Sequence, residues 1–223
     1  MEELISLQNV SKRYRTAAGE VRALDDVSLT IGQGEFVAVV GQSGSGKSTL
    51  MNILGCLDTP SEGCYRLNGR DMSRCSPSLR AQVRGREIGF VFQGFHLIPS
   101  LTALENVELP LIYRGVGREE RRRRARESLK RVGLETRLTH RPAELSGGQQ
   151  QRVAIARAIA MAPPLILADE PTGNLDTGSG GEIMDMLHAL HREGHTVVLI
   201  THDPTVAQTA SRRICIRDGR VVS

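Results

Sequence analysis

The sequence lacks long hydrophobic runs and paired-cysteine motifs. Its longest apolar stretches, residues 36–40 and 196–200, fall far short of the roughly 18 residues that a membrane-spanning helix needs. The start, MEELISLQNV, lacks the basic and apolar regions of a signal peptide, so we expect a cytosolic chain that reaches a membrane only through a partner. The four cysteines form no C-x-x-C pair, which argues against zinc or redox chemistry and predicts free thiols.

Positive charge is confined to one segment. The 223-residue chain has a net charge of +4, but residues 118–131 alone carry eight basic and three acidic residues. Apolar residues at helical spacing predict an amphipathic helix there: Ala125, Leu129 and Val132. Two i,i+4 ion pairs are expected on it, Glu119 with Arg123 and Glu120 with Arg124. The segment is therefore more typical of a solvated helix face than of a nucleic-acid surface, with contact to anionic lipid or a partner as the alternative.

Strand and helix signals alternate along the chain. Strand-like residues fill 4–10 and 23–31, and Asn68-Gly69 and Asp218-Gly219 mark tight hairpins. Residues 100–160 have helical periodicity with charged faces. The last third is expected to run as strand 165–168, helix 179–192 and strand 196–200. This order predicts an α/β protein with a parallel core sheet and a helical insertion.

A complete phosphate-binding loop follows the apolar strand 35–40. GQSGSGKST, residues 41–49, has the pattern G-x-x-x-x-G-K-[ST] between this strand and a helix expected over 50–57. Lys47 can reach the β- and γ-phosphates, and Ser48 can ligate Mg²⁺. The backbone of the loop is expected to contact the nucleotide through Gly41, Gln42, Ser43, Gly44, Ser45, Gly46 and Thr49. The sequence thus predicts a nucleoside triphosphate site.

Two carboxylates end a second apolar strand. The run PLILADE places Asp169 and Glu170 directly after buried residues. Paired acids at a strand end suit magnesium-dependent phosphoryl transfer, in which one holds the metal and the other polarises the attacking water. We assign Asp169 to the metal and Glu170 to the general base.

A second loop, SGGQ at residues 146–149, resembles half of a phosphate site. Ser146 can cap the following helix, and Gln149, three residues later, completes a capping box. The glycines Gly147 and Gly148 bare backbone N–H groups, yet no lysine is present to anchor an anion. Such a helix end binds phosphate well only if something else holds the nucleotide.

Taken in order, these motifs resemble the ATPase subunits of ABC transporters along the whole chain. The resemblance implies that Tyr14 stacks on adenine, that Gln93 senses Mg²⁺ and water, and that His202 meets the γ-phosphate. It also implies a head-to-tail homodimer with two sandwiched ATP molecules, in which SGGQ and Asp176 face the nucleotide held by Lys47 of the other copy. ATP and Mg²⁺ are the implied cofactors, and Ser48, Gln93 and Asp169 the implied magnesium ligands.

The segments GCLDTPSEG and LADEPTGNLD are similar to those of the subfamily that serves macrolide exporters, lipoprotein-release systems and cell-division complexes. This resemblance implies one ABC ATPase domain with a RecA-like P-loop core at 1–92 and 158–223, an N-terminal antiparallel β subdomain, and a helical subdomain at 93–157. It implies an ATP-hydrolysing subunit at the cytoplasmic face of the inner membrane, docked on a permease through residues near 93–108. Export is the expected task. Force transmission to cell-envelope machinery is the alternative, and action on ribosomes or DNA a weaker one.

Overall fold

The computed structural model of the protein describes residues 2–16 and 19–222, which form two compact units. The first unit comprises the chain up to Arg84 and from Gly194 onward, and the second runs from Gly85 to Glu193. Within the described ranges no helix is both long enough and apolar enough to span a membrane. The four cysteines are free thiols, as the sequence predicts.

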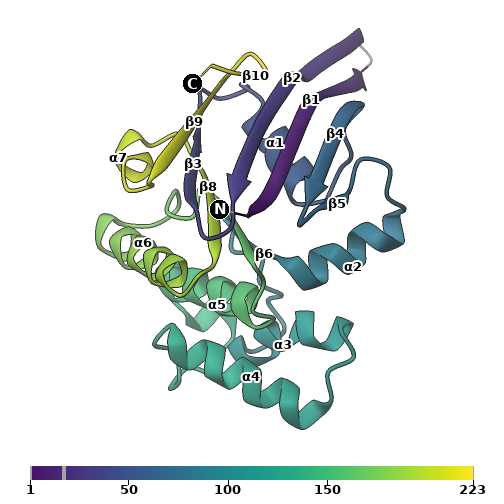
Figure 1. Cartoon of the computed structure of the whole chain (residues 1–223). Coiled ribbons are helices and arrows are strands. Elements are labelled where there is room, and N and C mark those ends of the chain that lie inside the picture. Colours follow the sequence, from purple (N-terminus) through teal and green to yellow (C-terminus); the bar gives the residue numbers. More distant parts are fainter. Residues whose placement is uncertain (1, 17–18, 223) are drawn as a thin grey trace. The chain divides into compact units, whose positions relative to one another are not determined.

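The first unit contains a four-stranded antiparallel sheet, drawn in purple and blue in Figure 1. Its strands lie in the order β2-β1-β4-β5, with bounds β1 (Glu3–Thr16), β2 (Gly19–Gly32), β4 (Glu62–Leu67) and β5 (Arg70–Asp71). Val27, Leu29 and Ile31 are buried and alternate along β2 with exposed residues. This alternation is the pattern of a sheet with one face on the core.

A parallel sheet forms the rest of the first unit's core. Strand β3 (Phe36–Val40) pairs in parallel with β8 (Thr196–Thr201) and β9 (Arg212–Arg217), and β10 (Arg220–Val221) adds to β9 as a hairpin. All six residues of β8 are buried, as is typical of a parallel strand that is covered on both faces. Helices α1 (Lys47–Leu54) and α7 (Pro204–Ala207) follow β3 and β8, while α2 (Pro77–Glu87) contains the boundary between the units.

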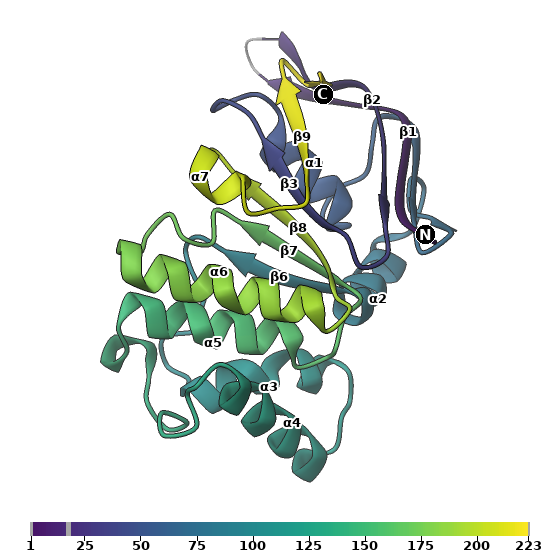
Figure 2. The ribbon, with the colours of Figure 1, turned by 60° about the vertical axis from the view of Figure 1, so that its left-hand side comes forward.

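The second unit combines two parallel strands with a helical layer. Strand β6 (Ile88–Phe92) pairs with β7 (Leu165–Asp169). Between them come α3 (Ala103–Tyr113), α4 (Arg118–Arg131), the short 3₁₀ turn η1 (Pro142–Glu144) and α5 (Gly147–Ile159), and α6 (Thr177–Arg192) follows β7. Helix α5 is central, since it contacts β6, α3, α4 and α6 (Figure 2). The predicted α/β fold with an antiparallel β part and inserted helices is therefore confirmed, while the boundaries 93 and 157 remain a prediction.

The basic segment forms the predicted amphipathic helix α4, whose apolar residues Ala125 and Leu129 are fully buried. The expected pair of Glu120 with Arg124 is present at 2.6 Å. The expected pair of Glu119 with Arg123 is wrong, because Arg123 lies between two other carboxylates. It pairs with Glu120 at 2.8 Å and Glu127 at 2.7 Å. The hydrogen bond from Arg123, followed by that from Arg124, lowers the pKa of the Glu120 carboxyl to about 2. Part of the positive charge is thus balanced within the helix.

Both predicted hairpins are present, and two helix starts differ from expectation. Asn68-Gly69 and Asp218-Gly219 all have positive φ, between 48° and 77°, as a type I′ turn requires. Helix α1 begins at Lys47 instead of the expected residue 50, because Gly46 ends the loop with a φ of 109° and the helix starts at once. Helix α6 begins at Thr177, two residues early, because Asp176 caps it.

Candidate nucleotide-binding site

The phosphate loop of the first unit presents an uncapped helix start. The loop follows β3, and Gly46 is the N-cap of α1 without any side-chain hydrogen bond to the helix. The first backbone N–H groups of α1 are therefore left uncovered by a capping side chain, and the helix dipole adds partial positive charge there. A helix start of this kind can bind an anion.

Two glycines of the loop are required by close contacts. A Cβ atom on Gly41 would lie 2.3 Å from the carbonyl oxygen of Ile216, and one on Gly46 would lie 2.6 Å from that of Ala23. Gly46 also has a left-handed φ of 109°, which disfavours any other residue. The loop can take this shape only with glycine at these places.

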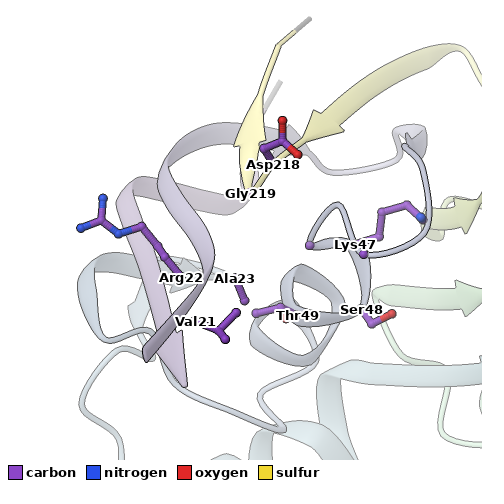
Figure 3. A pocket seen from close by; sticks show the side chains of 10 residues that line it. Val21, Arg22, Ala23, Lys47, Ser48, Thr49, Asp218 and Gly219 are labelled. Atoms are coloured by element: carbon purple, nitrogen blue, oxygen red, sulfur yellow. The ribbon is translucent and has the colours of Figure 1, made fainter. Parts of the chain in front are cut away.

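Lys47 folds back over its own loop. Its Nζ donates to the carbonyl oxygens of Gly41 at 2.7 Å and Gln42 at 2.8 Å, and Figure 3 shows the side chain turned toward the loop. The buried hydroxyl oxygen of Ser45 has no hydrogen-bond partner in the described part of the chain. A cation held by carbonyl oxygens beside an unsatisfied hydroxyl suits a loop that receives phosphate oxygens.

A pocket of about 400 Å³ lies beside this loop (Figure 3). Strand β2, the start of α1 and the Asp218-Gly219 hairpin form its walls, and the Gly219 N–H donates to the Ser45 carbonyl oxygen at 2.9 Å. The residues lining it are Val21, Arg22, Ala23, Gly44, Gly46, Lys47, Ser48, Thr49, Asp218 and Gly219. Its size falls in the range of small-ligand sites, roughly 300–1,000 Å³.

Tyr14 is fixed next to the strand that borders this pocket. It pairs across β1 and β2 with Val21, which lines the pocket, although Tyr14 itself is not part of the lining. Its hydroxyl donates to Asp58 at 3.0 Å, and Lys12 lies 5.0 Å from its ring centroid while bonding Asp58 at 2.7 Å. Burial, and then the bond to Asp58, raise the pKa of Tyr14. The ring is thus anchored by Asp58 and Lys12, two partners that no sequence motif indicates.

His202 lies at the same sheet edge as the phosphate loop. It is exposed and comes directly after β8, whose last residue Thr201 pairs with Val40 of β3. Because β3 and β8 are parallel, His202 and Gly41 each stand one residue beyond a paired position. The structure therefore brings these two predicted site residues to one end of the parallel sheet.

The second unit brings Gln93, Asp169 and Glu170 together in the same way. Phe92 pairs with Asp169 between the parallel strands β6 and β7, so Gln93 and Glu170 each stand one residue further along. Glu170 has a φ of 45°, in the left-handed region that non-glycine residues rarely adopt. Such strain persists only where surrounding structure imposes it, and it is common at functional sites.

Gln93 also contacts the segment after β7, and no local sequence pattern predicts this contact. Its Nε2 donates to Asn174 Oδ1 at 3.0 Å, and Asn174 Nδ2 donates back to the Gln93 carbonyl oxygen at 3.1 Å. A Cβ atom on Gly173 would lie 2.8 Å from the Gln93 amide nitrogen. The small residue therefore allows two motifs 81 positions apart to meet.

The SGGQ loop forms the start of α5, and its capping box is confirmed. The Gln149 N–H donates to Ser146 Oγ at 3.2 Å, and the Ser146 N–H donates to Gln149 Oε1 at 3.0 Å. Gly147 and Gly148, which lie between Ser146 and Gln149 in the sequence, have no side chains to cover their own N–H groups. A Cβ atom on Gly148 would lie 2.9 Å from the hydroxyl of Ser179, so the tight packing of α5 on α6 also calls for glycine.

Asp176 caps the neighbouring helix α6. Its carboxylate accepts from the Ser179 N–H at 3.0 Å and from the Ser179 hydroxyl at 2.7 Å. The hydrogen bond from the Ser179 N–H, followed by that from the Ser179 hydroxyl, lowers the pKa of Asp176. The second unit thus gathers Gln93, Asp169 and Glu170 at one sheet edge and Ser146, Gly147, Gly148, Gln149 and Asp176 at two adjacent helix starts.

Comparison with known proteins identifies the family. The family model described as "ABC transporter" matches residues 24–173. Over 98% of this chain and 96% of its own length, the uncharacterized ABC transporter ATP-binding protein YvrO of Bacillus subtilis is 54% identical. The macrolide export ATP-binding/permease protein MacB 1/2 of Paracoccus denitrificans is 56% identical over 99% of this chain. The chain spans only 33% of that relative's length.

Solved structures agree with the sequence comparison. A dimeric post-hydrolysis structure of the ATP-binding cassette MJ0796, bound to ADP and Pi, has a TM-score of 0.90 and 50% identity. It covers 98% of this chain, which in turn covers 97% of it. A second structure, described as dimeric MJ0796, a bacterial ABC transporter cassette, has a TM-score of 0.89 and 51% identity over the same shares. With its phosphate loop, its strand-end carboxylates and its capped SGGQ helix, the chain belongs to the ABC transporter family, as one of its ATP-hydrolysing ATP-binding cassettes.

Proposed function

We propose that two copies of this chain bind two ATP molecules with Mg²⁺ between them and that hydrolysis drives a membrane permease. One observation carries the proposal. Among the described residues, the starts of α1 and α5 both suit phosphate, but the first turn of α1 contains the cation Lys47 and the first turn of α5 contains none. The α5 start becomes a phosphate site only when a second copy supplies nucleotide. The dimeric MJ0796 structures support this arrangement.

In the proposed nucleotide site, Gly41 to Thr49 hold the phosphates and Tyr14 stacks on the adenine. Lys47 exchanges its present bonds to loop carbonyl oxygens for bonds to β- and γ-phosphate oxygens, which are stronger because both partners are charged. From the other copy, Ser146, Gly147, Gly148, Gln149 and Asp176 contact the γ-phosphate side of the same ATP. His202 stabilises charge on the transferred phosphoryl group.

The proposed magnesium ligands are Ser48, Gln93 and Asp169. No group of three or more histidine, cysteine or acidic residues that could hold a metal occurs in the described ranges. One carboxylate with a hydroxyl and an amide fits Mg²⁺, which usually keeps waters and binds through one or two carboxylates and substrate phosphates. Bound there, Mg²⁺ neutralises charge on the phosphate oxygens.

Glu170 is the proposed general base. It follows Asp169 directly, and its left-handed backbone turns the chain at this residue. The carboxylate accepts a proton from water as the water oxygen attacks the γ-phosphorus, the bond from the γ-phosphorus to the bridging oxygen of the β-phosphate breaks and ADP leaves. Gln93 orients that water. Loss of the γ-phosphate then removes the anion that joined the two copies, and the dimer opens.

The permease contact is proposed for residues near 93–108. Ile98 is 41% exposed there, and Asn106, which is fully buried, holds the segment through bonds to the backbone of Ile98, Leu101 and Thr102. A fixed loop with an exposed apolar side chain suits contact with another protein. The relatives described as macrolide export ATP-binding/permease proteins support export and association with a permease. A peripheral position at the cytoplasmic face of the membrane is part of the same proposal.

The test is a pull-down with Glu170→Gln, which we expect to bind ATP but to lose turnover by roughly 10²–10⁴-fold, because the amide cannot take the proton. The variant, loaded with ATP and Mg²⁺, is recovered from membranes and cytosol and its partners are identified by mass spectrometry. Recovery of a membrane protein supports the proposal. Recovery of ribosomal proteins or DNA instead, or near-normal ATP turnover by the variant, contradicts it. Lys47→Ala, unable to hold ATP, is the matched control.

A further inference from the structure

Gln151 is a buried amide in the second turn of α5, with no exposed surface. Its Nε2 donates to two backbone carbonyl oxygens, that of Phe92 at 3.2 Å and that of Pro171 at 2.6 Å. Its Oε1 is buried as well and has no hydrogen-bond partner among the described residues. Burying an amide with half of its capacity unused is costly, so a hydrophobic residue would suit this place better if packing alone mattered.

The two acceptors stand next to the proposed catalytic groups. Phe92 is the last residue of β6 and directly precedes Gln93, while Pro171 directly follows Glu170. Their strands are neighbours, since Phe92 pairs with Asp169. A single side chain from α5 therefore ties together the two strand ends from which Gln93 and Glu170 project.

A second side chain of α5 holds the far end of the same loop. Arg157 donates to the carbonyl oxygens of His96 at 2.6 Å and Phe95 at 2.9 Å, and burial lowers its pKa. Phe95 and His96 have φ values of 57° and 48°, so this turn is strained and needs such support. Helix α5 thus fixes the Gln93 loop at both of its ends.

We infer that Gln151 is a positioning residue for ATP hydrolysis, which links the SGGQ helix to the spacing of Gln93 and Glu170. The inference rests on the proposed function, because it takes these two residues as the groups that handle water. Gln151 itself touches neither water nor nucleotide in this scheme. Any shift of α5 on meeting the γ-phosphate of the partner is passed to both strand ends through its two hydrogen bonds. A misplacement of about 1 Å can cost 10²-fold in rate, so two short bonds suffice to matter.

The decisive variant is Gln151→Met, which keeps the length and shape of the side chain but removes both donors. We expect kcat for ATP hydrolysis to fall about 10- to 100-fold while KM for ATP stays within about twofold, because only the reacting geometry changes. The matched control is Gln150→Met, one residue earlier on the same helix. Its amide donates to the Leu145 carbonyl oxygen at 3.1 Å, near neither strand end. Rates are measured on the full chain and expressed per bound fluorescent ATP analogue, so unfolded protein does not count.

The inference is overturned if folded Gln151→Met hydrolyses ATP as fast as Gln150→Met, or if KM rises as much as kcat falls. If Gln151→Met does not fold, the variant Gln151→Glu tests the positioning role of Gln151 instead. Burial raises the pKa of such a carboxyl, to about 8–9 in documented cases, and only its protonated form donates. Activity relative to the native chain should therefore rise several-fold from about pH 9 to about pH 6. A constant ratio overturns the inference.

Failure of the inference and failure of the proposed function give different results. If Glu170→Gln still hydrolyses ATP at near-normal rates, the assignment of Glu170 as base is wrong. If Glu170→Gln is inactive while Gln151→Met and Gln150→Met behave alike, the assignment of Glu170 stands and only the positioning role of Gln151 is lost.

Discussion

The starts of α1 and α5 solve the same physical problem in opposite ways. Each helix leaves backbone N–H groups without partners inside the helix. At α1 no side chain caps them, and Lys47 adds a full positive charge. At α5 a reciprocal capping box of Ser146 and Gln149 satisfies two N–H groups, and the first turn contains no cation. The α1 end is open to phosphate on its own, whereas the α5 end is partly satisfied and gains a phosphate only with help.

This difference explains why one chain contains both kinds of helix start. An open, charged helix start binds its anion tightly in the isolated chain. A self-capped start contributes little until nucleotide is brought to it by another molecule. The response of α5 is therefore conditional on the partner, which is useful for coupling hydrolysis to dimer closure.

Removal of the charge at α1 should have the largest effect. Lys47→Ala is expected to weaken ATP binding by roughly 100-fold and to abolish turnover, because two charge-assisted bonds to phosphate are lost. Equilibrium binding of a fluorescent ATP analogue measures the first effect and phosphate release the second. Unchanged affinity would mean that the two helix starts do not differ as described.

A side chain at the α1 cap should be nearly as damaging. Gly46→Ala places a Cβ atom 2.6 Å from the Ala23 carbonyl oxygen at a φ of 109°. We expect a loss of about 1–3 kcal/mol in the free energy of unfolding, together with weaker ATP binding. Urea denaturation measures the first. Gly117→Ala is the matched control, since Gly117 caps α4 at a negative φ with no atom near its Cβ position.

Removal of the cap at α5 should affect stability less and turnover selectively. Ser146→Ala is expected to cost about 1 kcal/mol in the free energy of unfolding through loss of the cap. ATP binding by the single chain should stay unchanged, because Lys47 and the α1 start are intact. Turnover should fall, since Ser146 is proposed to face the partner's nucleotide. A drop in the ATP affinity of monomeric protein would contradict the contrast between the two ends.

The smallest expected effect concerns the acid-capped helix α6. Its cap, Asp176, has a pKa lowered by the bonds from Ser179, so folding favours the ionised carboxylate. The stability that it contributes is present above the ordinary aspartate pKa and is lost as pH falls through the lowered pKa of the folded state. Asp176→Asn should therefore reduce the acid dependence of the melting temperature slightly between about pH 5 and pH 2. If the melting temperatures of the variant and the native chain fall equally between about pH 5 and pH 2, the ionised Asp176 cap does not contribute to stability as described.

The functional motifs were largely readable from the sequence. Loop residues such as Gly41 and Lys47 obey local rules of backbone freedom and charge, and so does the capping box of Ser146 and Gln149. The pairing of Glu119 with Arg123 was predicted wrongly, because spacing alone cannot choose among several carboxylates within reach of one guanidinium.

Contacts between distant segments were not readable. Gln93 bonds Asn174 across 81 positions, and Gln151 reaches the backbone of both Phe92 and Pro171. Tyr14 is anchored by Asp58 and Lys12 in the same manner. Each of these bonds depends on the register of strands and on helix packing, which no local pattern in the chain encodes.

The sequence by itself determined the chemistry of this protein: a phosphate loop, two acids at a strand end, and a helix start without a cation. These follow from short-range preferences, since caps, glycine turns and charges act within a few residues. Only the tertiary structure decided how these groups are held, with Glu170 in a left-handed conformation, Gln93 joined to Asn174, and Gln151 between the two strand ends. Such placement arises because parallel pairing and the packing of α5 bring together backbone atoms that are far apart in the chain.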